Sequence, residues 1–330
     1  MKSNYKNTIT FAVCCVFILM IGLFLGIILG VTQIGISEIW KSMSSKNDTL
    51  ELVLIRDVRV PRALCALVTG GILGVTGAMI QGVTRNPIAE PSLLGVSQGA
   101  TLVIAVFYAL GMAVNMANVM LASLIGAFFS GLLVVLFISR KAGHSSITKI
   151  LLAGTAMSTF FLSLTTIIGL LSNQSQMLAF WVAGGFRNAS WQEFKLVAVL
   201  GSAGLAAAIL LSGKINILSL GDDVAVGLGQ NPERIRLITI LIMIPMIAAA
   251  VAVGKNIGFV GLIIPQIVRK VLGEDYRKVI PLSFLLGAVL LTYSDIAARL
   301  VYAPYEMPVG IFTALIGVPF FIMLARKEKG

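Results

Sequence analysis

Charged residues are scarce in this sequence. Only 12% of its 330 residues are Asp, Glu, Lys or Arg, whereas 58% are hydrophobic. Soluble domains contain about 25% charged residues, so the composition excludes an ordinary soluble protein. A helix needs about 20 apolar residues to cross a membrane, and apolar runs of this kind recur along nearly the whole chain. We therefore predict an all-α, polytopic membrane protein with one transmembrane domain over residues 1–330.

Cysteine and histidine are also rare. The three cysteines, Cys14, Cys15 and Cys65, lie inside apolar runs, and their spacing matches no metal-binding motif. The one histidine, His144, lies in the polar stretch SRKAGHSS, where we expect it to be solvated. We predict neither a metal site nor a cofactor.

A nucleotide-binding loop is missing as well. The pair Gly254-Lys255 is followed by Asn256 and lacks the upstream glycine of the phosphate-binding motif, so any ATP must be hydrolysed by a partner. The net charge of +11 does not indicate nucleic-acid binding, because Lys and Arg form short clusters between apolar runs.

Ten apolar segments are predicted to be membrane-spanning helices. They cover residues 9–30, 60–82, 93–110, 117–139, 148–170, 192–212, 236–254, 257–272, 281–298 and 307–325. The first resembles a signal peptide but has spanning length and no small-residue cleavage site, so we predict a retained helix. Most of the 25 Lys and Arg residues fall inside if both termini are cytoplasmic.

In the second predicted span, Gly70, Gly74, Ala78 and Gly82 form a stripe of small residues that lets a neighbouring backbone approach. We therefore predict close helix packing along this face.

Two segments predicted to be cytoplasmic are more than simple turns. In residues 84–100, Pro87 and Pro91 end the second helix and prepare the third. In residues 219–236, Asp222 and Asp223 favour a short helix, and Asn231 with Pro232 favours the start of another. We expect two short helices joined by glycines.

Ionisable side chains inside the predicted spans are few. Asp295 is the acid that we identify there, and Arg299, four residues later, would be its neighbour on a helix. An internal ion pair is as plausible as a transport role for Asp295, and the shortage of intramembrane acids disfavours an ion-coupled carrier.

Three arginines, Arg56, Arg59 and Arg62, lie at the entry to the second span on the side predicted to be outside, and Arg299 lies at the outer end of the ninth. This runs against the positive-inside bias. One explanation is structural, with Asp57 and Asp295 as partners of arginines that extend toward lipid headgroups. The other is recognition of an acidic partner from outside, since guanidinium groups pair with carboxylates bidentately.

Four sequence blocks resemble one transporter family. They read RVPRALCALVTGGILGVTGAMIQGVTRNPIAEPSLLGVSQGA, SLGDDVAVGLG, IGFVGLIIPQIVRKVLGEDYRKVIP and SDIAARL…YEMPVGIFTALIGVPFFIMLAR. In this order they resemble the permease subunits of ABC importers for ferric siderophores, haem and vitamin B12, the FecCD-type permeases. The likeness covers nearly the whole chain. It implies a type II importer bundle of about ten helices, a second permease subunit (an identical copy or a paralogue), two cytoplasmic ATPase subunits and an extracellular substrate-binding (lipo)protein.

The resemblance also implies roles for particular residues. Arg59, Arg62 and Arg299 match arginines that dock the binding protein, and Ile147 and Thr148 match a gate position on the translocation path. The predicted ATPase-coupling surface within residues 219–236 comprises Gly221, Asp222, Asp223, Gly227, Leu228 and Gly229. Many relatives have histidine where this chain has Gln266, which cannot be protonated, so a pH-linked role is not transferred.

These observations predict a permease subunit, not an enzyme, in the bacterial cytoplasmic membrane that imports a ferric siderophore. Import of haem or vitamin B12 by the same mechanism is the nearer alternative. An ion-coupled secondary transporter is the distant one.

Overall fold

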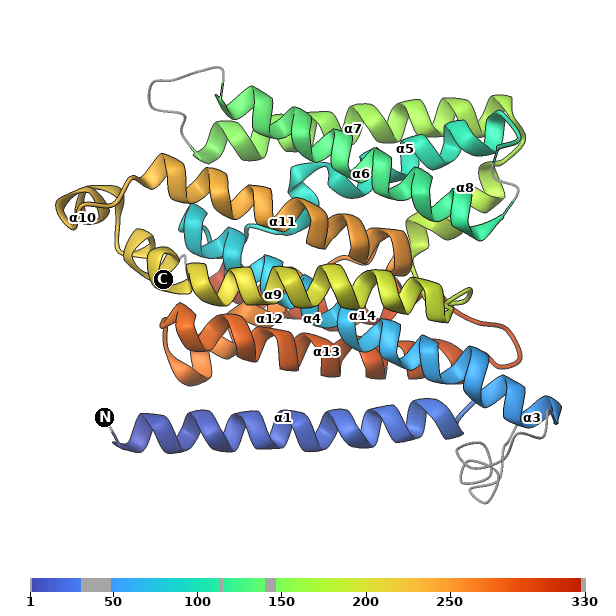
Figure 1. Cartoon of the computed structure of the whole chain (residues 1–330), viewed down its shortest axis with the longest axis horizontal. Helices are drawn as coiled ribbons and strands as arrows, with labels where there is room; N and C mark the ends of the chain where they lie inside the picture. The colour runs from blue at the N-terminus through green and yellow to red at the C-terminus, as the bar shows by residue number, and fades with distance from the viewer. Residues whose placement is uncertain (1, 31–48, 113–114, 140–146, 328–330) are drawn as a thin grey trace.

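Helices account for nearly all of the structure. The computed structural model describes residues 2–30, 49–112, 115–139 and 147–327, and no strand occurs in these ranges. The long helices lie side by side along one direction (Figure 1). The prediction of an all-α bundle is confirmed.

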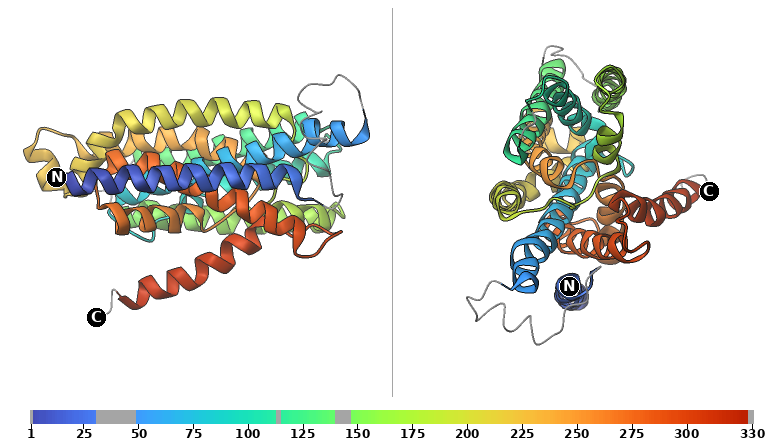
Figure 2. Two further views of the ribbon diagram at one scale, coloured as in Figure 1. Left: turned by 90° about the horizontal axis from the view of Figure 1, so that it is seen from below. Right: turned by 90° about the vertical axis from the view of Figure 1, so that its right-hand side faces the viewer.

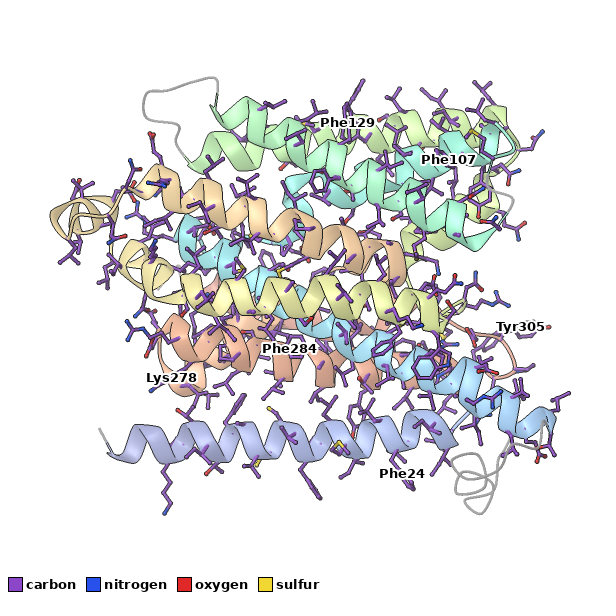
Figure 3. All side chains as sticks on the ribbon, viewed as in Figure 1. Phe24, Phe107, Phe129, Lys278, Phe284 and Tyr305 are labelled. Carbon is purple, nitrogen blue, oxygen red and sulfur yellow. The ribbon has the colours of Figure 1, made fainter. Side chains whose placement is uncertain are left out.

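Each of the ten predicted spans corresponds to a helix. These helices are α1 (Lys2–Ile28), α4 (Val60–Thr84), α5 (Val96–Ala109), α6 (Met116–Ser139), α7 (Ile147–Leu171), α9 (Trp191–Ser219), α11 (Pro232–Gly254), α12 (Val260–Leu272), α13 (Tyr276–Leu300) and α14 (Val309–Lys327). Among the described residues, six helices are long and apolar enough to cross a membrane, and α5, α6 and α14 contain shorter apolar segments. Large apolar side chains such as Phe24 and Phe129 are exposed on the outside of the bundle, as lipid contact requires (Figure 3).

Several shorter helices were not predicted. Helix α3 (Leu50–Val53) and the π-helical η1 (Leu54–Arg59) continue directly into α4, so that one span runs from Leu50 to Thr84. The 3-10 helix η2 (Pro91–Leu94) precedes α5, and α8 (Ser175–Ala183) precedes α9. Such pieces are too short to produce a spanning apolar run, which was the signal used for prediction.

Helix α4 is the centre of the bundle, with 83% of its most apolar window buried. The small-residue stripe predicted on it does face a neighbouring backbone, that of α13. A Cβ added at Gly74 would meet the carbonyl oxygen of Ser283, and one added at Gly70 would meet that of Gly287. The stripe therefore allows α13 to lie directly against α4.

Helices α5 and α12 are too short to cross a membrane, with 14 and 13 residues. Residues 84–100 were predicted to be a cytoplasmic segment that overlaps the third span, but part of this segment lies among the helices. The chain turns back into the bundle after Arg85, and α5 begins in its interior (Figure 1). There the Glu90 carboxylate accepts a 2.6 Å hydrogen bond from the backbone N–H of Phe259, which precedes α12. Half-length helices with irregular backbone are tolerated in a membrane protein only where protein or a polar cavity covers them.

The bundle has two distinct ends. The N-terminus, the C-terminus and the short helix α10 (Asp222–Gly227) lie at one, which we call the α10 end (Figures 1 and 2). Helix α3 and the connection between α13 and α14, with Tyr305, lie at the other, which we call the α3 end (Figure 3). Helix α14 diverges from the bundle toward the C-terminus (Figure 2).

Candidate functional site

Arg62, in the first turns of α4, is the centre of a buried ion-pair cluster at the α3 end. Its Nε and Nη2 lie 3.0 and 2.9 Å from Oδ1 of Asp295 on α13. Its Nη1 lies 2.8 Å from Oε1 of Glu306, in the connection to α14. Only 6% of Arg62 and 1% of Asp295 are exposed. A buried guanidinium needs such partners, because an uncompensated charge in the interior is costly.

Arg59 and Arg299 lie beside this cluster and donate to the end of α1. Nη1 of Arg299 donates to the carbonyls of Gly26 and Leu29, and Nη1 of Arg59 donates to those of Ile27 and Ile28. Carbonyl groups at a helix C-terminus lack helical partners and attract cations. The two arginines thereby connect α1 to α4 and α13.

The local acid–base pairs predicted from the sequence are both present. Asp295 Oδ2 lies 3.2 Å from Nε of Arg299, four residues later on α13. Asp57 lies 3.4 Å from the exposed Arg56. The structure thus brings Arg59, Arg62 and Arg299 together, with acceptors from this chain around all three. Their role in docking a partner stays a prediction.

A cavity of about 290 Å³ adjoins Arg62 and Glu306, and Lys255 also lines it. Lys255 follows α11, and its Nζ donates to the carbonyl of Gly185 at 3.1 Å and lies 5.5 Å from the centre of the Trp181 ring. Burial lowers the pKa of the Lys255 ammonium, while the nearby Glu193 carboxylate opposes that shift. The sequence analysis did not identify this lysine as a site residue.

Glu193, an acid near Lys255, was also not identified by the sequence analysis. It lies in the first turn of α9, is 5% exposed, and forms a reciprocal capping box with Ser190. The pattern Ser-x-x-Glu is a recognisable helix start, so SWQE contained the signal.

Helix α10 projects at the opposite end and contains three of the six residues of the predicted coupling surface, and the other three flank it. The exposed part comprises Asp223, Gly227, Leu228 and Gly229, with Val224 and Val226 beside them. Gly221 and Gly229 adopt positive φ angles of 132° and 73°, which glycine accommodates without strain.

Asp222 points back toward the bundle. Its Oδ1 lies 2.6 Å from Nη2 of Arg236 on α11 and 3.2 Å from Nη2 of Arg85, which caps α4. The expectation of two short helices here is wrong. Asn231 caps a helix that begins at Pro232, as expected, but that helix is the long α11, because its apolar sequence continues without interruption.

A polar network lies inside the bundle near the α10 end. Arg269 on α12 donates to Oε1 of Gln81 on α4 and to the Tyr276 hydroxyl of α13, at 2.7 and 2.8 Å. Gln266 donates to the carbonyl of Pro87 at 2.6 Å. These residues border a cavity of about 880 Å³. Gln266 therefore helps to hold the re-entrant segment in place.

For Ile147 and Thr148, the predicted gate, the structure describes only the backbone, and α7 begins at Ile147. The side chains of these residues and the whole of His144 lie outside the described part. Among the residues that are described, no group of three or more His, Cys, Asp or Glu side chains could hold a metal ion.

The apolar helices, the half-length α5 and α12, and the charged features at each end define a polytopic membrane protein of the permease type. The chain belongs to the FecCD transport family, whose pattern it matches over residues 18–327. The resemblance drawn from the sequence blocks is thereby confirmed.

Named relatives and a solved structure agree with this membership. The chain is 41% identical to the iron(3+)-hydroxamate import system permease protein FhuB of Bacillus subtilis (strain 168), over 94% of this chain and 82% of that protein. It is 37% identical to the Fe(3+)-citrate import system permease protein YfmD of the same organism, over 99% and 98%. A structure described as an inward-facing conformation of a metal-chelate type ABC transporter matches with a TM-score of 0.84 and 27% identity, over 96% of this chain and 98% of that one.

Proposed function

We propose that this chain is the permease subunit of an ATP-driven importer that moves a ferric siderophore into the cytoplasm. The observation that supports this most directly is the 41% identity to the iron(3+)-hydroxamate permease, which extends over 94% of the chain. The permease does no covalent chemistry. Two cytoplasmic ATPase subunits hydrolyse ATP, and an extracellular binding protein delivers the chelate.

The proposed orientation places the α10 end in the cytoplasm and the α3 end outside. Exposed residues of α10 then contact the ATPase, and the gate at Ile147 and Thr148 lies at the cytoplasmic side of the path. Arg59, Arg62 and Arg299 lie where an acidic binding protein approaches. A second permease subunit, a copy or a paralogue, completes the path. Closure of the ATPase pair moves α10 and, through it, the ends of α4 and α11.

Import of haem is the nearer alternative, since the hemin transport permease HmuU of Yersinia pestis is 33% identical over 91% of this chain. The iron-chelate permeases named above are more similar, which favours a siderophore.

Uptake by the reconstituted importer tests the proposal. The permease, its cognate ATPase and its cognate binding protein are placed in proteoliposomes with ⁵⁵Fe-labelled hydroxamate siderophore, ferric citrate or haem, or with ⁵⁷Co-labelled cobalamin. We expect ATP-dependent accumulation of a ferric siderophore. Accumulation of haem alone would select the alternative, and uptake by the permease without ATPase would refute an ABC importer.

A further inference from the structure

The two sides of the Arg62 guanidinium are in different situations. The side formed by Nε and Nη2 faces Asp295, whose side chain is 1% exposed. The remaining nitrogen, Nη1, faces Glu306, whose side chain is 23% exposed. The inner pair is closed to any partner, whereas the outer pair is accessible from the cavity that both residues line.

This cavity has a size that suits one acidic side chain. Its volume is about 290 Å³, at the lower limit of pockets that enclose a whole small molecule, roughly 300 Å³. Arg187 and Asn188 also line it and are exposed, so the cavity reaches the surface at the α3 end.

The charges around the cavity favour an anion. Arg62, Arg187 and Lys255 line it together with a single carboxylate, that of Glu306. Behind the lining, Asp295 and Glu193 add two carboxylates and Arg299 adds a further cation. The whole set then holds four cations and three carboxylates, so a second carboxylate that enters from outside would meet a small excess of positive charge.

Glu306 lies in a segment that leads directly into α14. The backbone N–H of Met307 donates to the carbonyl of Ala298 at 2.9 Å, and that of Val309 donates to Gly184 at 3.3 Å. Besides these two bonds, the ion pair with Arg62 fixes the segment to the bundle. Loss of the ion pair would loosen the start of α14.

We propose that this cavity receives a carboxylate of the extracellular binding protein, and that Glu306 occupies Arg62 until that carboxylate replaces it. The inference rests on the proposed function and adds a competitor within the chain. Docking then exchanges one carboxylate for another on Nη1 of Arg62, so the guanidinium stays paired throughout. The exchange releases residues 301–308 and transmits docking at the α3 end to α14.

The test uses the permease–ATPase complex in lipid nanodiscs and its cognate binding protein. Glu306→Gln removes the competing charge while Arg62 keeps Asp295. If Glu306 blocks the site about nine-tenths of the time, its removal makes docking roughly tenfold tighter. The matched control is Glu51→Gln, which removes an exposed acid at the same end outside the cavity, and we expect less than a twofold change. Glu306→Asp keeps the charge and should dock about as the wild type does.

A second measurement follows the released segment. Hydrogen exchange of residues 301–308 should rise when the binding protein docks on the wild type, and should already be raised in Glu306→Gln without it. The proposal is overturned if Glu306→Gln docks no more tightly than the wild type, or if Glu51→Gln shows an equal gain. If the wild-type complex neither docks the protein nor imports, the proposed function fails as well.

Discussion

Asp295 is the residue on which the charge cluster at the α3 end depends. It is 1% exposed and contacts the guanidinium groups of both Arg62 and Arg299. Each arginine also has other acceptors, but Asp295 is the only acid that the described structure places against both. Its removal would leave two buried cations with insufficient countercharge.

We therefore expect Asp295→Asn to lower the free energy of unfolding by about 3–5 kcal/mol, the cost of breaking a buried ion pair by removing one partner. Thermal unfolding of the purified protein in detergent micelles measures the effect. Asp57→Asn is the control, because the Asp57–Arg56 pair is exposed and contributes at most about 1 kcal/mol. Equal losses in the two variants would contradict the buried-cluster interpretation.

The two adjacent acids of α10 have different surroundings, so substituting each one distinguishes a role in positioning α10 from a role in contacting the ATPase. Asp222 faces Arg85 and Arg236, whereas Asp223 is exposed on the projecting side of the helix. We expect Asp222→Asn to lower the siderophore imported per ATP hydrolysed by about threefold or more, since α10 would be held less firmly to α4 and α11. Asp223→Asn should weaken ATPase binding instead, with a normal transport ratio once the complex is assembled. Simultaneous assays of ATP hydrolysis and ⁵⁵Fe uptake distinguish these results, and the opposite assignment would refute the positioning role.

At the scale of secondary-structure elements, the close contact of α4 with α13 leaves no room for a methyl group. A Cβ at Gly74 would meet the Ser283 carbonyl, so Gly74→Ala should destabilise the protein by about 1–3 kcal/mol through overpacking. Gly213→Ala is the control, because its Cβ would come no closer than 3.5 Å to the flexible Arg277 side chain. The yield of monodisperse protein and its thermal unfolding report the difference. An equally stable Gly74→Ala variant would mean that α13 can move away at no cost.

The positions of the helices along the chain were largely predictable from the sequence. How far each helix and its connections extend through the bundle was not. Apolar runs located the long helices because a spanning helix must match the thickness of the membrane, but the same signal did not reveal that α5 and α12 are only half-length. The re-entrant segment was missed because Pro87 and Pro91 indicate only that a helix ends, not where the chain goes next. Glu90 is paired with Phe259, 169 residues later, and no local pattern reports such a contact. Within the charge cluster, the i,i+4 pair Asp295–Arg299 was predictable from helix geometry, whereas the pair Arg62–Glu306, 244 residues apart, was not.

For the whole molecule, the proposed orientation predicts which end is accessible from outside the cell. Tyr305 is exposed at the α3 end, and Glu233 lies at the start of α11 near the α10 end. In intact cells, a membrane-impermeant maleimide should label Tyr305→Cys but should label Glu233→Cys only after permeabilisation. The unsubstituted protein is the control for the native Cys14, Cys15 and Cys65. The reverse pattern of labelling would invert the topology.

The continuous helix from Leu50 to Thr84 has a consequence for the cost of inserting its arginines. At about 1.5 Å per residue, its 35 residues extend roughly 52 Å, well beyond a hydrocarbon core of about 30 Å. With an average tilt of ~20°, about 21 residues counted back from Thr84 cross that core, which brings the chain to Leu64. With Thr84 placed at the inner edge of that core, Arg62 lies just past its outer edge, and Arg59 and Arg56 lie at the depth of the headgroups, where the end of α1 covers Arg59. On this placement the three charges stay outside the hydrocarbon core, so the surplus length of one helix explains how a basic cluster can precede an apolar span.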